Sequence, residues 1–218
     1  MIITCHGVAE TNPDYANKLV KNLPGHKIVQ LFWGDIPSLL ENEILTDDQK
    51  TAAWKQMGLR DLRPTINQFV GDAMAWFNPL LREEIKERLF SQLPPVEPTI
   101  LLLHSWANCI LWDLLSDSEF AKCLNIQKII TAGCPLLIYE ILIKNTHSLA
   151  TMPPWTNFYH PLDLIASPLG GFVTGDITDI KINDPPWDIF GDLGVILAGQ
   201  AHTSYWASKQ VADACKDF

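Results

Sequence analysis

The stretch "TILLLHSWANCILWDLLS" spans residues 99 to 116 and changes character in its middle. Its first half is a run of apolar and β-branched residues, which is typical of a strand that is buried on both faces. Its second half follows helical spacing and begins directly after His104 and Ser105. A strand that passes into a helix through so short a turn lifts the serine hydroxyl clear of the sheet. The N–H groups of the new helix's first turn then lie beside that hydroxyl. We therefore interpret Ser105 as a candidate nucleophile.

Strand-like and helical patterns alternate along most of the chain, which is typical of an α/β fold with a parallel sheet. Short apolar runs predict strands at residues 1–5, 26–33, 99–104, 126–133 and 155–160. Helical spacing predicts helices at residues 14–23, 79–93, 106–117 and 204–218. The segment 136–145 is a further candidate helix, but its apolar content leaves the periodicity ambiguous. The clearest helix starts at Asn78, a good N-cap residue, with Pro79 at its first position. The segment 161–200 is rich in Gly, Pro and Asp, so we expect mainly loop there, with a hairpin near 172–182.

Composition excludes several classes of function. The chain has 218 residues, of which 47% are hydrophobic, so a single domain over residues 1–218 can bury a full core. Its net charge is −9 and it has no cluster of Lys or Arg, which argues against nucleic acid as a partner. No apolar run reaches the length of a membrane span, and the start of the chain lacks the pattern of a signal peptide. Five cysteines without CxxC spacing indicate reduced thiols in a cytoplasmic protein rather than a metal or redox centre.

Several segments in chain order resemble the α/β-hydrolase superfamily, in particular its lipase- and esterase-like members. They are "CHG" at 5–7, the strand-to-helix stretch around Ser105, "ITAGCPL" at 130–136, "NFYHPLDLIASPL" at 157–169 and "AHTSYW" at 201–206. The resemblance implies a three-layer α/β/α sandwich with a mostly parallel sheet in the order 2-1-3-4-5. It also implies a reduced N-terminus, because the loop that stabilises the oxyanion follows the first strand. Residues 36–76 would be a helical insertion, either a cap over the site or ordinary packing.

A serine hydroxyl is a poor nucleophile until a base removes its proton. The chain order Ser105, Asp163, His202 is the order that the α/β-hydrolase fold requires. The resemblance implies that His202 is the base and that Asp163 orients it. It places the oxyanion donors at Trp106, Gly7 and Val8, and it makes His6 and Trp106 candidates for substrate contact. We expect a serine hydrolase that cleaves a carboxylic ester or thioester through an acyl-enzyme, without a cofactor or metal.

Each of these residues has a plainer interpretation. Ser105 is also a favourable helix N-cap, and His202 is a candidate for an ordinary packed histidine. Asp163 follows Pro161 and suits a turn, in which case Asp176 or Asp179 would replace it as the acid.

The residues around the serine raise a further question. The positions two before and two after it hold Leu103 and Ala107, where such turns usually carry glycine. Leu103 fits if its side chain points into the layer of helices. We interpret His104 and His160 as structural residues.

Two other classes of function stay open at this point. One is a non-catalytic binding protein with a hydrolase-like fold, which the departure at Leu103 favours. The other is a peptidase or amidase on the same scaffold. If the protein is a serine hydrolase, we expect its partner to be a small-molecule or lipid-like ester substrate, with no nucleic acid and no stable membrane insertion. Oligomeric state and the identity of the acyl and leaving groups do not follow from the sequence, because loop shape decides them.

Overall fold

The computed structural model describes residues 1–7, 12–36, 75–143, 153–163, 165–171, 175–182 and 201–216. In these residues the chain forms a six-stranded sheet with the order β2-β1-β3-β4-β5-β6, in which every neighbouring pair is parallel. The strands are β1 Ile2–Cys5, β2 Ile28–Leu31, β3 Pro98–His104, β4 Asn125–Ala132, β5 Trp155–Tyr159 and β6 Ile177–Lys181. The predicted α/β class and the order of the first five strands are confirmed, and β6 extends the sheet by one strand.

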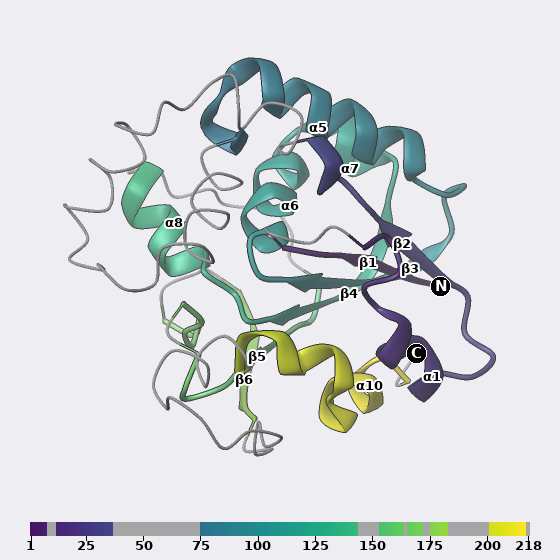
Figure 1. Cartoon of the computed structure of the whole chain (residues 1–218), viewed down its shortest axis with the longest axis vertical. Helices are drawn as coiled ribbons and strands as arrows, with labels where there is room; N and C mark the ends of the chain where they lie inside the picture. Colours follow the sequence, from purple (N-terminus) through teal and green to yellow (C-terminus); the bar gives the residue numbers. More distant parts are fainter. Residues whose placement is uncertain are drawn as a thin grey trace.

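Helices cover both faces of this sheet (Figure 1). They are α1 Asn17–Asn22, α5 Pro79–Gln92, α6 Ala107–Leu115, α7 Ser118–Lys122, α8 Leu136–Ile143, the 3₁₀ helix η1 Ser204–Ala207 and α10 Lys209–Ala214. One core lies under α5, α6 and α7, and a second lies under α1, η1 and α10. The central strand β3 serves both cores, because Leu101 and Leu103 pack in the first, whereas Ile100 and Leu102 pack in the second.

The start of α5 follows the sequence prediction closely. Asn78 accepts hydrogen bonds through its side chain from the backbone N–H groups of Leu80 and Leu81, and Pro79 occupies the first turn. The buried stripe of this helix is Leu81, Ile85 and Leu89. The short helix α7, which the sequence analysis did not predict, is capped in the same way by Asp117, whose side chain accepts from the N–H of Glu119.

The hairpin expected near residues 172–182 is wrong. Residues Ile177–Lys181 form β6, which pairs in parallel with β5 and aligns Ile177 with Trp155. A hairpin joins antiparallel strands through a tight turn, whereas here the 17 residues between β5 and β6 carry the chain back to the start of the sheet's edge strand. Local composition signals the turns in this segment but not the direction in which the strand pairs.

Two expectations fall largely outside the described residues. The proposed cap at 36–76 lies there except for Ile36, Ala75 and Trp76, all three of which are buried in the core beneath α5 and α6. The backbone around Val8 is likewise not described. Within the parts of the chain that are described, no helix has the length and apolar character needed to cross a membrane.

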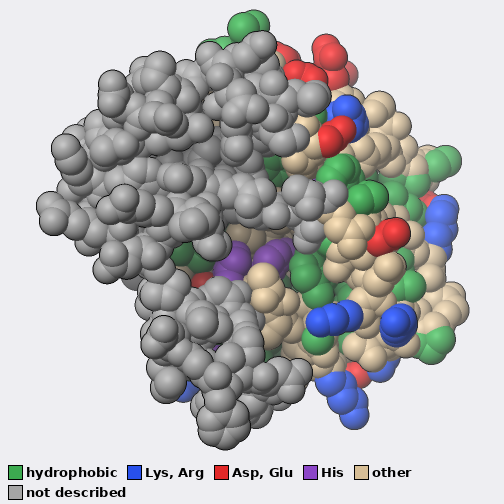
Figure 2. All heavy atoms as spheres, in the orientation of Figure 1, with side chains coloured by type: hydrophobic (Ala, Val, Ile, Leu, Met, Phe, Trp, Pro, Cys, Tyr) green, Lys and Arg blue, Asp and Glu red, His purple; other side chains and the backbone are tan. Residues whose placement is uncertain are grey.

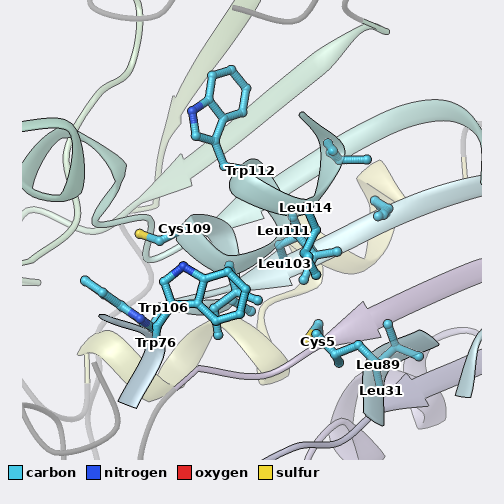
Figure 3. Packing of buried hydrophobic residues seen from close by; sticks show 14 of the residues in the cluster. Cys5, Leu31, Trp76, Leu89, Leu103, Trp106, Cys109, Leu111, Trp112 and Leu114 are labelled. Carbon is cyan, nitrogen blue, oxygen red and sulfur yellow. The ribbon is translucent and has the colours of Figure 1, made fainter. Parts of the chain in front are cut away.

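Leu103, the departure noted in the sequence, has a clear place in the core. It is 3% exposed and lies in β3 opposite Cys5 of β1 and Thr131 of β4. Its side chain belongs to the core cluster on the α5 and α6 side of the sheet, and Figure 3 shows it directed toward Leu111 and Leu114 of α6. The side chain therefore points into the layer of helices, as the sequence analysis required for it to be tolerated.

This position predicts a stability effect. Leu103→Ala should lower the free energy of unfolding by about 2–5 kcal/mol, because it leaves a cavity between the sheet and α6. Urea unfolding followed by circular dichroism measures this difference. The matched control is Leu80→Ala, since Leu80 is 82% exposed, and it should change stability by less than ~0.5 kcal/mol. Equal effects of the two substitutions would show that Leu103 is not a core residue.

Candidate active site

Ser105 occupies a strained turn between β3 and α6. Its φ is +56°, and it is the one non-glycine residue with a positive φ in the described part of the chain. A left-handed backbone costs a residue with a side chain of order 1–3 kcal/mol, so neighbouring contacts must hold it. The Ser105 N–H donates to the carbonyl of Ala132 at 3.0 Å. Its own carbonyl accepts from the backbone N–H of Asn108 at 3.1 Å and from the Asn108 side chain at 2.7 Å.

The Ser105 hydroxyl does not cap the following helix. Helix α6 begins at Ala107 with Trp106 as its N-cap residue, and no side-chain hydrogen bond caps it. The hydroxyl oxygen lies instead 2.7 Å from Nε2 of His202. The strained turn thus presents the hydroxyl to an imidazole, which is a different task from helix capping.

The structure brings together the three side chains that the sequence analysis selected for catalysis. Nδ1 of His202 lies 2.8 Å from Oδ2 of Asp163, and Nε2 of the same ring faces the Ser105 hydroxyl. The carboxylate can only accept, so Nδ1–H donates to Asp163 and Nε2 is left to accept from the serine. Asp163 is 4% exposed, and the His202 side chain is 17% exposed. Histidine side chains are visible in a hollow on the face drawn in Figure 2.

The Asp163 carboxylate is held in its ionised form. Burial acts to raise its pKa, but the hydrogen bond and charge of His202, followed by the hydrogen bonds from Tyr205 and Ile165, outweigh burial and lower the pKa below its usual value. The Tyr205 hydroxyl lies 2.9 Å from Oδ2, and the N–H of Ile165 lies 3.2 Å from Oδ1. A buried carboxylate with this set of donors is suited to stabilising a cation on His202.

The two alternative acids lie elsewhere. Asp179 is in β6, where it accepts hydrogen bonds from the Asn157 side chain at 2.6 Å and from the N–H groups of Leu169 and Gly170 at 2.9 and 2.7 Å. It therefore fastens the loop that follows Asp163 onto the edge of the sheet. Asp176 is exposed and directly precedes β6. Asp163 is accordingly the aspartate that contacts His202.

Two other histidines surround the site as buried neutral groups. Nε2–H of His104 donates to the backbone carbonyl of His202 at 2.6 Å, and the two rings lie 4.8 Å apart between centroids. Burial, and next the charge of His202, lowers the pKa of His104 to about 3. His6 lies 2.5 Å from the carbonyl of Gly7 through Nδ1 and accepts from the N–H of Trp33 through Nε2 at 3.2 Å. Burial lowers its pKa to about 4.

These contacts bear on the roles expected for the histidines. His6 is 1% exposed, and both of its ring nitrogens bind the protein's own backbone, so its contacts shape the turn after β1. His104 holds the backbone of His202 through its hydrogen bond to the His202 carbonyl. His160 directly follows β5; its N–H donates to the Tyr205 hydroxyl at 2.8 Å, and its Nδ1 accepts from the N–H of Leu162. The structural interpretation of His104 and His160 agrees with these bonds.

Gly7 and Trp106 border the serine from two sides. A Cβ atom added at Gly7 would lie 2.2 Å from Cβ of Ser105 and 3.2 Å from the backbone N of Trp106, so only glycine fits there. The Trp106 ring is 2% exposed and packs edge-on against Tyr139 and Phe77. The backbone of Gly7 and the N-terminal end of α6 therefore meet at the Ser105 hydroxyl, where a substrate oxygen could be bound.

Tyr205 and Gly133 belong to the site but were not singled out from the sequence. Gly133 has a φ of +59°, and a Cβ atom there would lie 2.9 Å from the Tyr205 ring and 3.1 Å from the His202 ring. The spacing of three residues between His202 and Tyr205 is a signal that was available, because such residues share one side of a helical turn. No comparable signal marks the structural role of Asp179, since its partners are two backbone N–H groups of a loop and the side chain of Asn157 on the neighbouring strand.

The described residues contain no group of three or more His, Cys, Asp or Glu side chains that could hold a metal ion. Comparison with known proteins adds no family to this geometry, because no family model matches the chain and no curated protein matches it either. The contacts within the site are therefore the basis for inferring what it does.

The close approach at Gly7 predicts an effect of substitution. Gly7→Ala should lower the free energy of unfolding by about 3 kcal/mol, because its methyl group collides with a turn that is already strained. The control is Gly25→Ala, where φ is +84° and no atom lies within 4 Å of the added Cβ, so only the backbone conformation opposes it at about 1 kcal/mol. Urea unfolding compares the two. A Gly7→Ala variant no less stable than Gly25→Ala would contradict the packing described here.

The buried histidines predict a loss of stability in acid. In the unfolded chain His6 and His104 bind protons below about pH 6.5, whereas in the folded chain their pKa values are about 4 and about 3. The unfolded state therefore binds more protons in this window, and stability falls as the pH drops from about 6.5 toward 4. The slope approaches ~1.4 kcal/mol per pH unit for each histidine.

Urea unfolding between pH 7 and pH 5 measures this slope. The variant His104→Gln keeps a neutral donor for the His202 carbonyl but cannot titrate. The slope of its stability with pH should therefore lack the contribution of one histidine, which approaches ~1.4 kcal/mol per pH unit. An unchanged slope in this variant would mean that His104 binds protons equally in the folded and unfolded states over this pH range, which would contradict its lowered pKa.

Proposed function

We propose that this chain is a serine hydrolase of the α/β-hydrolase type, which cleaves a carboxylic ester or thioester through an acyl-enzyme on Ser105. The observation that carries the proposal is the continuous set of hydrogen bonds from Ser105 to His202 to Asp163, built on a strained strand-to-helix turn. This arrangement of nucleophile, base and orienting acid is the one that activates a serine for acyl transfer.

In the first half of the reaction, His202 removes the proton of Ser105 as the hydroxyl oxygen attacks the substrate's carbonyl carbon. Asp163 holds the imidazole in the tautomer that accepts this proton and stabilises the resulting cation. Backbone N–H groups of Trp106 and of the Gly7–Val8 segment are the candidates for binding the oxyanion. His202 then passes its proton to the leaving alcohol or thiol as the bond to the acyl carbon breaks.

In the second half, water replaces the leaving group. His202 takes a proton from the water as its oxygen attacks the acyl carbon. The bond between the acyl group and Ser105 then breaks, and the proton returns to the serine oxygen. The buried neutral His104 holds the His202 backbone in place through both halves, since it donates to its carbonyl and does not titrate near neutral pH.

Two features argue against a binding protein without activity. The positive φ of Ser105 costs free energy, and a buried ionised carboxylate such as Asp163 requires compensating donors. A binding surface needs neither of them. Leu103, which favoured that alternative in the sequence, is accommodated in the core without disturbing the contact between Ser105 and His202.

Ester hydrolysis by single variants tests the proposal. On a nitrophenyl ester, Ser105→Ala should lose about 10⁴-fold or more in turnover, because the nucleophile is absent. Asp163→Asn should lose at least ~10²-fold near neutral pH, because an amide can present the wrong group to the imidazole. Circular dichroism of each variant confirms that the fold is retained.

The matched control for the acid is Asp176→Asn, whose carboxylate is exposed before β6. It should change turnover by less than ~10-fold. Undiminished hydrolysis by Ser105→Ala would remove Ser105 from the reaction. A peptidase or amidase would be indicated if the wild-type protein cleaved anilides at rates similar to those of the matched esters.

A further inference from the structure

We propose that Tyr205 is a positioning residue of this site, whose phenol fixes the Asp163 carboxylate and thereby sets how strongly His202 holds its proton. This inference rests on the proposed function for its kinetic consequences, but the geometry that carries it is independent of the reaction. Tyr205 touches neither the nucleophile nor a reacting atom in that scheme, so it acts through Asp163.

The direction of its hydrogen bonds is determined by its partners. The backbone N–H of His160 lies 2.8 Å from the phenol oxygen, and an N–H can only donate, so the phenol accepts there. Its single proton is then available for Oδ2 of Asp163 at 2.9 Å. Burial, followed by the charge of Asp163, raises the pKa of Tyr205, which keeps that proton on the phenol.

The phenol shares an acceptor with the catalytic histidine. Oδ2 of Asp163 receives both the Tyr205 hydroxyl and Nδ1–H of His202, whereas Oδ1 accepts from the N–H of Ile165. A donor on a carboxylate oxygen takes up part of its negative charge. Removal of the phenol should therefore strengthen the attraction between Asp163 and protonated His202, and it should also loosen the carboxylate's orientation.

The Tyr205 ring has little freedom to move. It is completely buried. Gly133, which has a positive φ, lies against the ring, and a Cβ atom added there would be only 2.9 Å from Cε2 of Tyr205. The backbone around Gly133 is held in turn, because its N–H donates to the carbonyl of Phe158 at 3.1 Å. The packing of the Tyr205 ring between the sheet and η1 thus fixes the position of its hydroxyl beside Asp163.

The other titratable groups facing this cluster must be considered for any effect of pH. His104 lies against the His202 ring and stays neutral because burial, and next the charge of His202, lowers its pKa to about 3. The thiol of Cys134 stays protonated because burial raises its pKa to about 12. His160 contacts the phenol through its backbone N–H, and Asp179 fastens the loop after Asp163.

The test compares Tyr205→Phe with the wild-type protein over a range of pH. In the variant, kcat for a nitrophenyl ester should fall about 3- to 30-fold while KM changes less than about 2-fold, because the lost bond orients the base and does not bind substrate. The acid limb of the rate profile should move to higher pH by about 0.5 to 1 pH unit, because His202 holds its proton more strongly.

The matched control is Tyr15→Phe. Tyr15 is also buried, but its hydroxyl bonds to Thr4 and to the carbonyl of Leu31 rather than to the triad. This variant should leave the acid limb in place. If the acid limb of the rate profile also stays in place in Tyr205→Phe, Tyr205 is only a packing residue and the inference is overturned.

A second variant should move the acid limb in the opposite direction while hardly altering packing. Tyr205→3-fluorotyrosine makes the phenol a stronger donor with nearly the same shape, so the acid limb should move to lower pH. This variant keeps the inference testable if Tyr205→Phe does not fold. Movement in the same direction as for Tyr205→Phe, or no movement, would contradict it.

Proton NMR separates this inference from the proposed function. The pH at which the His202 ring resonances change can be followed whether or not the protein hydrolyses esters. If the wild-type protein shows no hydrolysis but this pH still moves upward in Tyr205→Phe, the proposed function fails and the role of Tyr205 stands. If hydrolysis is present and the titration is unmoved, only the role of Tyr205 fails.

Discussion

The left-handed backbone of Ser105 turns its hydroxyl toward His202, and every other contact of the site is arranged around that turn. At a φ of +56° the residue would relax to another conformation unless its neighbours held it. The carbonyl of Ala132 and the two donors of Asn108 supply that hold from β4 and α6. Gly7 leaves the space that the serine side chain occupies. The turn is therefore supported by α6, which directly follows it, and by two segments that are distant in sequence. Those two meet the turn only because the sheet places β1 and β4 on either side of β3.

The same edge of the sheet collects the remaining groups. Asp163 follows β5, and the helical segment that holds His202 contacts both Asp163 and Ser105 at the carboxyl ends of β5 and β3, as is usual for sites of open parallel sheets. Loops at such an edge need their own fastening, since they lack regular pairing. Asp179 fastens the loop after Asp163, and Tyr205 joins the carboxylate to the backbone of His160. Buried polar bonds of this kind have few alternatives, so they hold the triad residues in a single geometry.

Hydrophobic runs were sufficient to predict five strands, because each run is an intrinsic property of a short segment. The parallel arrangement was predicted from the alternation of these runs with helical patterns. The direction of β6 was not predictable in this way, because it depends on how a long connection returns to the sheet. Leu103 shows the same limit, since the sequence marks it as unusual but only the packing against α6 shows why it fits. Ser105 was inferred from the change from strand to helix pattern, whereas Asp163 and His202 came from the resemblance to α/β-hydrolases, with Asp176 and Asp179 left open as alternative acids. The structural roles of Tyr205 and Asp179 were not predicted, because neither residue belongs to a recognisable motif and their bonds depend on how the loops after β5 fold against the sheet.

If His202 and Asp163 activate Ser105 as a nucleophile, the serine should react with a fluorophosphonate probe. Intact-mass analysis of the treated wild-type protein, followed by peptide mapping, detects this reaction. We expect a single covalent adduct on Ser105, formed more slowly when Asp163 is replaced by Asn. A folded protein that forms no adduct, or one whose adduct maps to another residue, would contradict it.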